Sequence, residues 1–190
     1  MPVDAMPISE PTETEAQRIA RGLRRRDLAL LDELVERYQY RLVRYLVYLT
    51  ASRERADDWA QETWVRVLNR ASQYDGRSRF ETWLFSIARN LAIDDLRRKE
   101  GVSLESAELP PDAASPFRDA ARSQDAVRLA AALDRLAPVY REALLLRFQE
   151  DLSLQEISQI TGSPVPTVST RIHRALAQLR SQWEGGVNVL

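Results

Sequence analysis

The sequence predicts an all-α fold made of two small helical domains joined by a flexible linker, and three observations lead to this prediction. Proline is absent from residues 12–109 and glycine from residues 23–75 and 102–161, so long helices are permitted in both halves of the chain. No segment shows sustained alternation of apolar and polar residues, the pattern of a strand. The stretch at about 101–120 collects a glycine and three prolines among Ser, Asp and Glu, which is typical of a linker.

The first unit is predicted to be a bundle of three or four helices. Its longest helix carries apolar residues at alternating steps of three and four, on one stripe: Leu28, Leu31, Val35, Tyr38, Leu42, Tyr45 and Leu49. A second helix is expected over residues 56–69, because acids near its start suit the positive end of a helix dipole. After a turn at Asp75 and Gly76, another helix carries Phe80, Trp83, Leu84, Ile87 and Leu91 and ends in basic residues 97–99.

The second unit opens with a helix carrying Leu129, Leu133 and Leu136, and Pro138 fits the first position of the next helix, which holds Tyr140, Leu144 and Phe148. The strongest local signal is the capping box formed by Ser153 and Glu156, which starts a helix that ends near Thr161. Gly162 then supplies a turn. Ser163 can cap a last helix with Pro164 at its first position, ending at about Trp183.

These breaks divide the chain into a disordered tail (1–14), a first unit (15–100), a linker (101–122), a second unit (123–184) and a short tail (185–190). The net charge of −1 conceals a local asymmetry. Residues 21–100 contain 17 basic and 13 acidic side chains, and residues 163–183 contain Arg171, Arg174 and Arg180 with no acid. The overall charge therefore says little about what each unit binds.

Composition excludes several classes of function. The chain has no cysteine and a single histidine, which removes thiolate nucleophiles, disulfides and His-based metal sites. All but one of its 27 basic residues are arginine, and no glycine-rich phosphate loop is present, so an ATPase or kinase is not expected. No apolar run approaches the roughly 20 residues of a membrane span, and no signal peptide is evident. We expect a cytoplasmic protein.

The end of the second unit has the layout of a helix-turn-helix. A short helix is followed by a glycine turn and by a longer basic helix that can enter the DNA major groove. On a helical wheel, Val165, Val168, Ile172, Leu176 and Leu179 share one face. The opposite face carries Thr167, Thr170, Arg171 and Arg174, whose hydroxyls and guanidiniums can contact phosphates and base edges. The alternative is that these residues form the solvated side of an amphipathic helix. His173 fits a phosphate contact or an ordinary surface position equally well.

Residues 74–98 interleave the aromatic residues Tyr74, Phe80, Trp83 and Phe85 with arginines. Exposed rings beside guanidiniums suit single-stranded nucleic acid, because rings stack on bases while arginines follow the backbone. Phe80, Trp83 and Ile87, however, have the spacing of a helix core. The pattern by itself therefore favours a structural role for most of these rings.

Three segments together resemble a known family: ADDWAQETWVRVLNR (56–70), RFETWLFSIARNLAIDDLRR (79–98) and SLQEISQITGSPVPTVSTRIHRALAQLR (153–180). They are similar to bacterial RNA polymerase sigma factors of the sigma-70 family, in the extracytoplasmic-function (ECF) group. The resemblance implies that residues 15–100 correspond to sigma region 2 and residues 123–184 to sigma region 4. It further implies core RNA polymerase and promoter DNA as partners, contacts to the clamp helices of the largest subunit and the flap of the second-largest, and an anti-sigma factor.

The resemblance also implies roles for individual residues. The segment that docks on polymerase matches Asp57, Asp58, Gln61, Glu62, Trp64 and Arg66; from sequence alone, these acids are a solvated helix start. The region that melts the minus-10 element and captures an unpaired base matches Arg77, Ser78, Phe80, Trp83, Arg89, Asn90 and Asp94. The helix that reads the minus-35 element matches Thr167, Ser169, Thr170, Arg171, His173 and Arg174. The chain departs from the family's usual residues at Ser163, Pro166 and Ser169, and loss of the usual lysine at Ser169 removes one expected phosphate contact.

We therefore expect an alternative sigma factor, a non-enzymatic subunit without a cofactor or metal, that reads two promoter elements and traps melted minus-10 DNA. The alternative is a stand-alone helix-turn-helix regulator that binds DNA without polymerase. A DNA-processing enzyme is disfavoured, because the adjacent acids Asp57 and Asp58, or Asp94 and Asp95, point in different directions on a helix. A further hypothesis is that the free chain is compact and unable to bind DNA.

Overall fold

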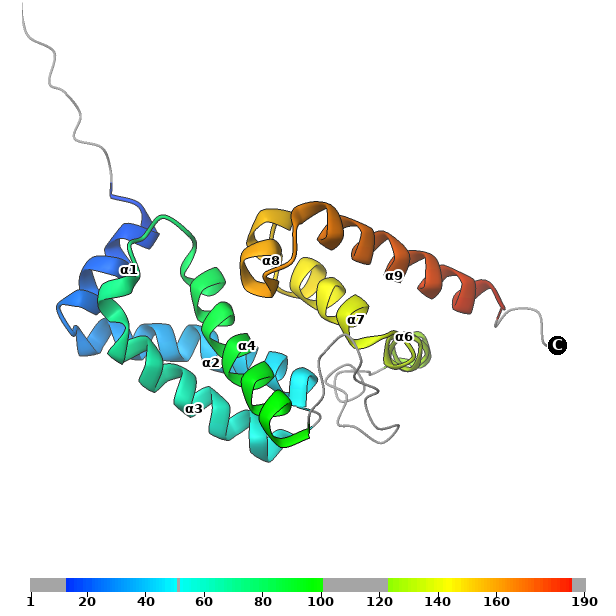
Figure 1. The fold of residues 1–190 in the computed structure, drawn as a ribbon, viewed down its shortest axis with the longest axis horizontal. Helices are drawn as coiled ribbons and strands as arrows, with labels where there is room; N and C mark the ends of the chain where they lie inside the picture. Colours follow the sequence, from blue (N-terminus) through cyan, green and yellow to red (C-terminus); the bar gives the residue numbers. More distant parts are fainter. Residues whose placement is uncertain (1–12, 51, 101–122, 186–190) are drawn as a thin grey trace, which may run out of the picture.

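The computed structural model describes residues 13–50, 52–100 and 123–185, and within these ranges it contains helices and no strands. The all-α prediction is confirmed. The predicted linker at 101–122 and most of both predicted tails lie outside the described residues. The helices form two units that lie next to each other (Figure 1).

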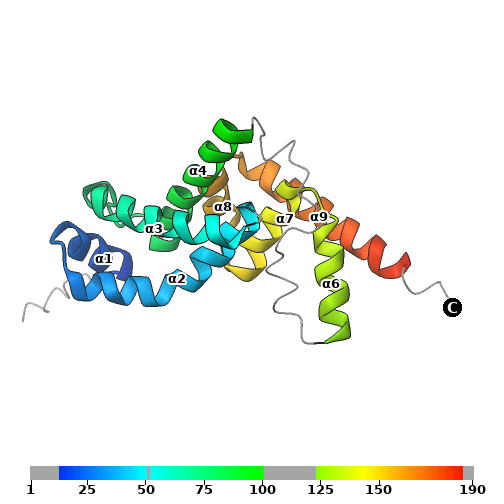
Figure 2. The same cartoon turned by 90° about the horizontal axis from the view of Figure 1, so that it is seen from below.

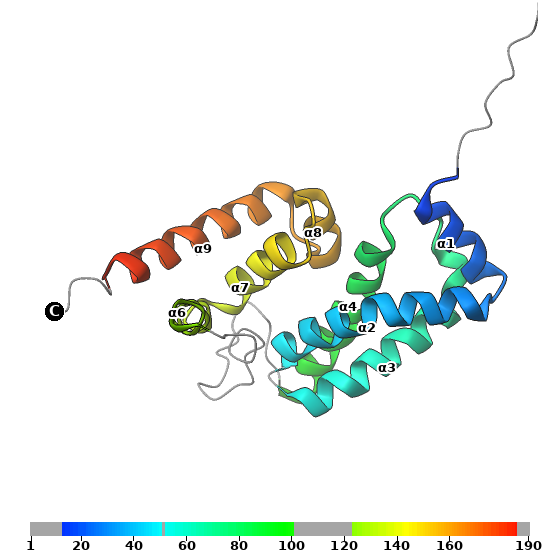
Figure 3. The ribbon, with the colours of Figure 1, turned by 180° about the vertical axis from the view of Figure 1, so that it is seen from behind.

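The first unit consists of α1 (Glu15–Arg24), α2 (Leu28–Thr50), α3 (Arg53–Asn69), a short 3-10 turn (Ala71–Gln73) and α4 (Phe80–Glu100). Helices α2 and α3 lie side by side (Figure 3), and α4 packs on both. Helix α1 was not predicted individually, although its capping box is visible in the sequence. The Thr14 hydroxyl accepts from the Gln17 backbone N–H at 3.2 Å, and the Gln17 side chain accepts from the Thr14 backbone N–H at 3.0 Å.

Glycine is needed at the turn before α4. Gly76 has φ of 76°, in the left-handed region. A Cβ atom at this position would lie 2.9 Å from the carbonyl oxygen of Ala16, so the turn also packs against the backbone of α1. The predicted turn at this position is present.

The core of the first unit is rich in aromatic rings. Phe80 is 1% exposed, and its ring centroid lies 5.4 Å from that of Tyr38, 5.6 Å from that of Tyr74 and 6.0 Å from that of Trp83. The ring of Trp64 stacks on Phe80 from α3 at 6.5 Å. Phe85 is also fully buried. The structural interpretation of this aromatic segment is therefore correct for most of its rings.

The second unit consists of α6 (Gln124–Asp134), α7 (Pro138–Leu144), a π-helical turn (Leu145–Gln149), α8 (Leu154–Thr161) and α9 (Val165–Gly185). Pro138 opens α7 as predicted. The capping box at the start of α8 is confirmed, with the Glu156 carboxylate 2.8 Å from the Ser153 backbone nitrogen. Gly162 ends α8 with φ of 69°.

Two predictions need correction between α7 and the start of α9. Phe148 was assigned to the apolar side of a helix with Leu144, but it is 64% exposed. The π turn closes with a bond from the Glu150 N–H to the Leu145 carbonyl, which shifts the helical phase and turns Phe148 outward. Helix α9 begins at Val165 rather than Pro164, because the Pro164 carbonyl accepts the first helical bond, from Val168.

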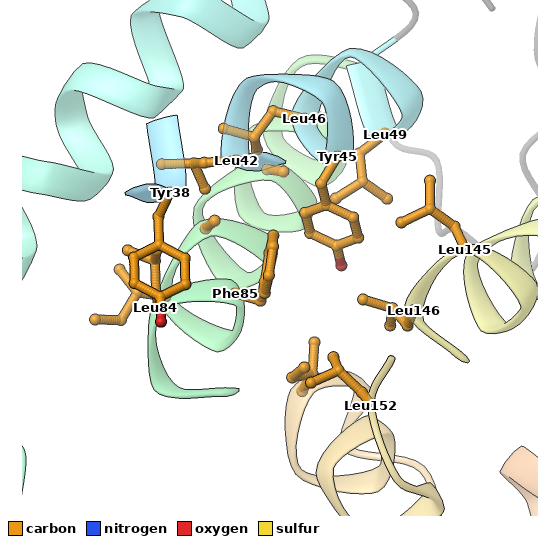
Figure 4. Packing of buried hydrophobic residues seen from close by; sticks show 14 of the residues in the cluster. Tyr38, Leu42, Tyr45, Leu46, Leu49, Leu84, Phe85, Leu145, Leu146 and Leu152 are labelled. Atoms are coloured by element: carbon orange, nitrogen blue, oxygen red, sulfur yellow. The ribbon is translucent and has the colours of Figure 1, made fainter. Parts of the chain in front are cut away.

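The two units share one apolar core. Leu145, Leu146 and Leu152 of the second unit point toward Tyr45 and Phe85 of the first (Figure 4). Helix α8 packs against α4, and the two helices lie near each other in Figures 1 and 2. The structure is therefore a closed form in which the second unit covers one side of α4.

Candidate protein and nucleic-acid interfaces

Helix α3 presents a polar surface at its N-terminal half. The Ser52 hydroxyl caps the helix by accepting from the Arg55 N–H at 3.3 Å. Asp58, Gln61 and Glu62 are exposed, and the Glu62 carboxylate pairs with Arg66 Nε at 3.0 Å. Asp57 is half-buried and pairs with Arg53 at 3.1 Å. Three of the six predicted polymerase-binding residues are thus exposed on one stretch of helix.

Trp64 differs from the rest of the predicted polymerase-binding set. Its ring is 9% exposed in the aromatic core, and its indole N–H donates to Gln39 Oε1 at 2.6 Å. Sequence reasoning missed two exposed apolar residues instead, Val65 (49% exposed) and Leu68 (41%). They follow Gln61 by four and seven residues and therefore continue its face. This helical spacing from Gln61 is the feature of the sequence that could have identified Val65 and Leu68.

The exposed stripe of α3 ends at a shallow apolar pocket of about 310 Å³. Leu68 and Asn69 line it from α3, and Leu23, Leu28 and Leu31 line it from α1 and α2. Leu28 is 71% exposed, although its position on the predicted apolar stripe suggested burial. Its place at the first residue of α2, beyond the main body of the core, explains the difference. The surface of α3 thus changes from acidic to apolar along its length.

The predicted minus-10 residues do not all lie on one surface. Phe80 is enclosed in the core, so its ring has no face for a base. Trp83 is half-buried, with its ring 5.1 Å from that of Tyr74. In the loop before α4, Arg77 is exposed and pairs with Asp75 at 3.3 Å, while the Ser78 carbonyl accepts from the Tyr74 hydroxyl at 2.7 Å.

Helix α4 divides the remaining minus-10 residues between two sides. Trp83, Asn90 and Asp94 fall within about 60° of one another on a helical wheel, and Asn90 and Asp94 are exposed. Arg89 faces the second unit, where its Nε lies 2.8 Å from Glu142 Oε1 and its Nη2 3.3 Å from Oε2. Burial works against the charged form, but Glu142 beside it raises the pKa of Arg89 above its usual range. The structure therefore separates Arg89 from Asn90.

The predicted minus-35 residues gather on α9. Thr167, Thr170, Arg171 and Arg174 line an open groove of about 400 Å³, together with Val139 and Tyr140 of α7. Two internal bonds orient this surface, because Arg171 Nη1 donates to the Ser163 hydroxyl at 2.8 Å and Thr170 Oγ1 donates to the Pro166 carbonyl at 2.9 Å. The remaining members are Ser169, which is half-buried, and His173, which is exposed.

The inner face of α9 follows the predicted stripe with one exception. Val168 and Ile172 are buried, and Leu179 packs against the core. Leu176 is 41% exposed, and Ala175 takes the buried position instead. The small alanine lets α9 approach the rest of the unit closely there, which leaves the next residue outside.

The described residues contain no group of three or more His, Asp or Glu side chains placed to hold a metal ion. A search of the same residues finds no helix with the length and apolar character of a membrane span.

Comparison with known proteins matches both units. The family model for Sigma-70 region 2 matches residues 34–101, and the model for Sigma-70, region 4 matches residues 126–179. The chain is similar to the ECF RNA polymerase sigma factor SigE of Mycolicibacterium smegmatis, with 35% identity over 78% of this chain and 60% of that relative. It is also similar to the ECF RNA polymerase sigma factor SigX of Bacillus subtilis, with 30% identity over 80% of this chain and 82% of that relative.

Among solved structures, the chain resembles CnrH, whose structure was determined in complex with the cytosolic domain of CnrY. The TM-score is 0.65 at 26% sequence identity, and the match covers 90% of this chain and 99% of CnrH. The likeness therefore extends over both helical units.

Proposed function

This chain belongs to the sigma-70 family and, within it, to the ECF RNA polymerase sigma factors, and from that premise we propose how its surfaces direct transcription. As an alternative sigma factor, it binds core RNA polymerase and brings it to a class of promoters. The observation that carries this proposal is the open groove on α9, which two threonines and two arginines line, with Thr170 and Arg174 exposed. Hydroxyls and guanidiniums on an exposed helix are the groups that contact phosphates and read base edges in the major groove.

Promoter contacts are divided between the two units in this proposal. The α9 surface, with Ser169 and His173 at its sides, reads duplex DNA at the minus-35 element. In the first unit, Asn90 recognises the unpaired minus-10 base, because its amide can both donate and accept hydrogen bonds to a base edge. Trp83 and Asp94 flank Asn90 on α4, and Arg77 and Ser78 lie in the loop before this helix. Phe80 supports this surface from the core.

Polymerase docking is assigned to the outer face of α3. Asp58, Gln61 and Glu62 supply polar and charged contacts to the clamp helices of the largest subunit, while Asp57 and Arg66 hold the neighbouring charges in place. Val65 and Leu68 add apolar area at the other end of this face. These side chains can be buried in the interface without the cost of removing a charge from water. Trp64 acts from beneath this face by packing.

The second unit contacts the flap of the second-largest subunit, and an anti-sigma factor regulates the chain. The structure of CnrH, which shares the fold over both units, was determined in complex with the cytosolic domain of CnrY, and this supports a protein regulator here. Catalysis belongs to the polymerase, so this chain is a non-enzymatic subunit without a cofactor. It acts in the cytoplasm together with the polymerase. The stand-alone regulator is not favoured, because the region 2 match covers most of the first unit.

Gel filtration with purified bacterial core RNA polymerase tests the docking surface. We expect the wild-type chain to co-elute with core polymerase and the Asp58→Arg variant to elute separately. Asp32→Arg reverses an exposed acid on α2 and serves as the matched control, which should still co-elute. Co-elution of a folded Asp58→Arg variant would refute the docking face. Failure of the wild-type chain to co-elute, with tight binding to duplex DNA, would favour a stand-alone regulator.

A further inference from the structure

The outer surface of α3 changes in character from one end to the other. Five exposed side chains that fall within about 80° of one another on a helical wheel form this surface, which we call the α3 face: Glu54, Asp58, Gln61, Val65 and Leu68. The neighbouring acids Asp57 and Glu62 pair with arginines of the same helix. Within the described residues, neither Glu54 nor Asp58 forms an ion pair. The N-terminal end of the α3 face therefore carries two uncompensated negative charges.

Four arginines cluster at the opposite end of this face, where α1, α2 and α3 meet. Arg24, Arg25 and Arg26 stand at the end of α1 and in the turn that follows, and Arg70 is the C-cap residue of α3. All four are exposed, and none forms an ion pair in the part of the chain that the structure describes. Arg26 lines the shallow apolar pocket together with Leu68. This arginine corner is thus continuous with the α3 face, as the place of α3 beside α1 and α2 shows (Figures 1 and 3).

The backbone fixes the arginine corner in place. The N–H of Arg26 donates to the Leu23 carbonyl at 3.0 Å and that of Asp27 to the Gly22 carbonyl at 3.1 Å, which is the Schellman pattern at the end of a helix. Arg26 occupies the left-handed position of this motif with φ of 56°, where glycine is usual. The Asp27 carboxylate accepts from N–H groups at the start of α2, so it is engaged as a helix cap. The turn therefore holds a positively charged side chain at the rim of the pocket.

The order of charges along this surface is complementary to itself. Asp58 and Arg70 are twelve residues apart, which corresponds to about 18 Å along a helix. A two-fold axis at the midpoint, near residue 64, turns a second copy end for end. That copy then places its own Arg70 opposite Asp58 and its own Asp58 opposite Arg70, so each charge contact occurs twice. Val65 lies next to the axis, where the valines of the two copies meet.

The apolar side chains of this surface fit the same arrangement. Leu28 is 71% exposed, Val65 49% and Leu68 41%, and among the described residues no other helix covers them. Apolar residues between two charged ends give a core and a polar rim, which is the usual anatomy of a protein interface. A partner must present the reverse order of charge to match both ends. A second copy of this chain, turned by the two-fold axis, presents that order.

We propose that two copies of this chain associate through their α3 faces in an antiparallel, two-fold arrangement. Glu54 and Asp58 of each copy pair with the arginine corner of the other. One helix face and its corner form a small interface, so the dimer is weak and depends on concentration and salt. The regulatory consequence rests on the proposed function, because Asp58 and Gln61 are proposed polymerase contacts. Only the monomer then binds core polymerase, and the apparent dissociation constant is the intrinsic value divided by the monomer fraction.

Sedimentation velocity of the full chain at low salt, over a series of concentrations, tests the dimer. The wild-type mass should rise from that of one chain, 21.8 kDa, toward twice this value. An acid-reversed variant, Glu54→Arg/Asp58→Arg, and an arginine-reversed variant, Arg26→Glu/Arg70→Glu, each bring like charges together. Each alone should self-associate about tenfold or more weakly than wild type. An equimolar mixture of the two should form dimers again, because each reversed end meets its complement.

Matched controls carry the same changes of charge at exposed residues away from the α3 face. They are Asp32→Arg/Glu36→Arg and Arg97→Glu/Arg98→Glu. Each control should dimerise as the wild type does, and mixing the two should add nothing. If a reversed variant does not fold by circular dichroism, Asp58→Arg alone or Arg25→Glu/Arg70→Glu takes its place with the same expectation.

Two results would overturn the proposal. One is a wild-type chain that is still wholly monomeric at about 0.5 mM, since its self-association would then be weaker than the millimolar end of binding. The other is a mixture of the two reversed variants that associates no more than either variant alone, because antiparallel charge pairing requires the mixture to recover.

The fate of this inference can be separated from that of the proposed function. A wild-type chain that dimerises but does not co-elute with core polymerase would refute the proposed function and leave the dimer standing. A monomeric wild-type chain that co-elutes with polymerase, while Arg26→Glu/Arg70→Glu does not, would assign the arginine corner to the polymerase interface. That result would refute the dimer and leave the proposed function intact.

Discussion

Phe80 provides the most informative single substitution in the first unit, because the resemblance to sigma factors assigns it to DNA while the structure encloses it. Its ring is 1% exposed and contacts the rings of Tyr38, Trp64, Tyr74 and Trp83. Removing a buried phenylalanine side chain costs about 3–5 kcal/mol, and the aromatic surroundings place this site toward the upper end. At a urea m-value of ~2 kcal/mol/M, Phe80→Ala should lower the unfolding midpoint by about 2 M.

Urea unfolding followed by far-UV circular dichroism measures this effect. Trp183→Ala removes a larger ring that is 39% exposed at the end of α9, and its midpoint should change far less. Phe80→Leu preserves apolar volume and should fold while keeping its DNA binding. A loss below about 1 kcal/mol for Phe80→Ala would refute the placement of this ring in the core, since losses of that size are typical of partly exposed sites. Folded Phe80→Leu with no promoter binding would indicate a direct DNA contact.

Three further predictions concern stability. Trp64→Phe removes the hydrogen bond to Gln39 and should cost about 1 kcal/mol in thermal unfolding, with polymerase co-elution retained; unchanged stability would contradict the contact. Gly76→Ala should cost about 1 kcal/mol more than Gly162→Ala, since both have positive φ but only Gly76 has backbone within 3 Å of a new Cβ; equal losses in urea would refute this difference. Burial of Glu156 opposes its ionisation, yet hydrogen bonds from residue 153 lower its pKa. The resulting contribution to stability is present at neutral pH and is lost as the pH falls through this lowered pKa, so Glu156→Gln should destabilise the chain at neutral pH and the difference from wild type should shrink as the solution is made more acidic. A difference that does not shrink in urea titrations at acidic pH would contradict this assignment.

The sequence predicts features that depend on neighbouring residues. Apolar periodicity located α2 and α4, acids near the helix start located α3, and the Ser153 capping box located the start of α8, because these signals lie within one or two helical turns. The same kind of signal, Thr14 with Gln17, marks α1 and was overlooked. The π turn in the second unit could not be expected from periodicity, since it interrupts the 3.6-residue repeat itself.

Features that depend on tertiary contacts were beyond prediction from one sequence. A helical wheel assigns Phe80 and Trp64 to faces, but whether a face meets the core or a partner is decided by other helices. Arg89 shows the same limit, because its partner Glu142 lies 53 residues away in the other unit. Among the predicted polymerase-binding residues, Asp58 and Gln61 are exposed, whereas Trp64 is enclosed. Exposure of Val65 and Leu68 likewise follows from the absence of a covering helix among the described residues.

Closure of the two units combines apolar packing with buried ion pairs. The leucines that join the second unit to α2 and α4 bury apolar surface, and the Glu142 and Glu150 contacts add buried charge pairs. Buried pairs often contribute little net stability, because desolvation offsets their attraction. In this structure they fix the position of the second unit against α2 and α4.

Run-off transcription on fragmented bacterial genomic DNA tests the central claim most directly. Core RNA polymerase supplemented with the wild-type chain should start transcripts at a defined set of promoters that core polymerase alone does not use. The folded Asp58→Arg variant should lose these starts, and the Asp32→Arg control should retain them. Absence of new start sites with a folded wild-type chain that co-elutes with polymerase would contradict the account.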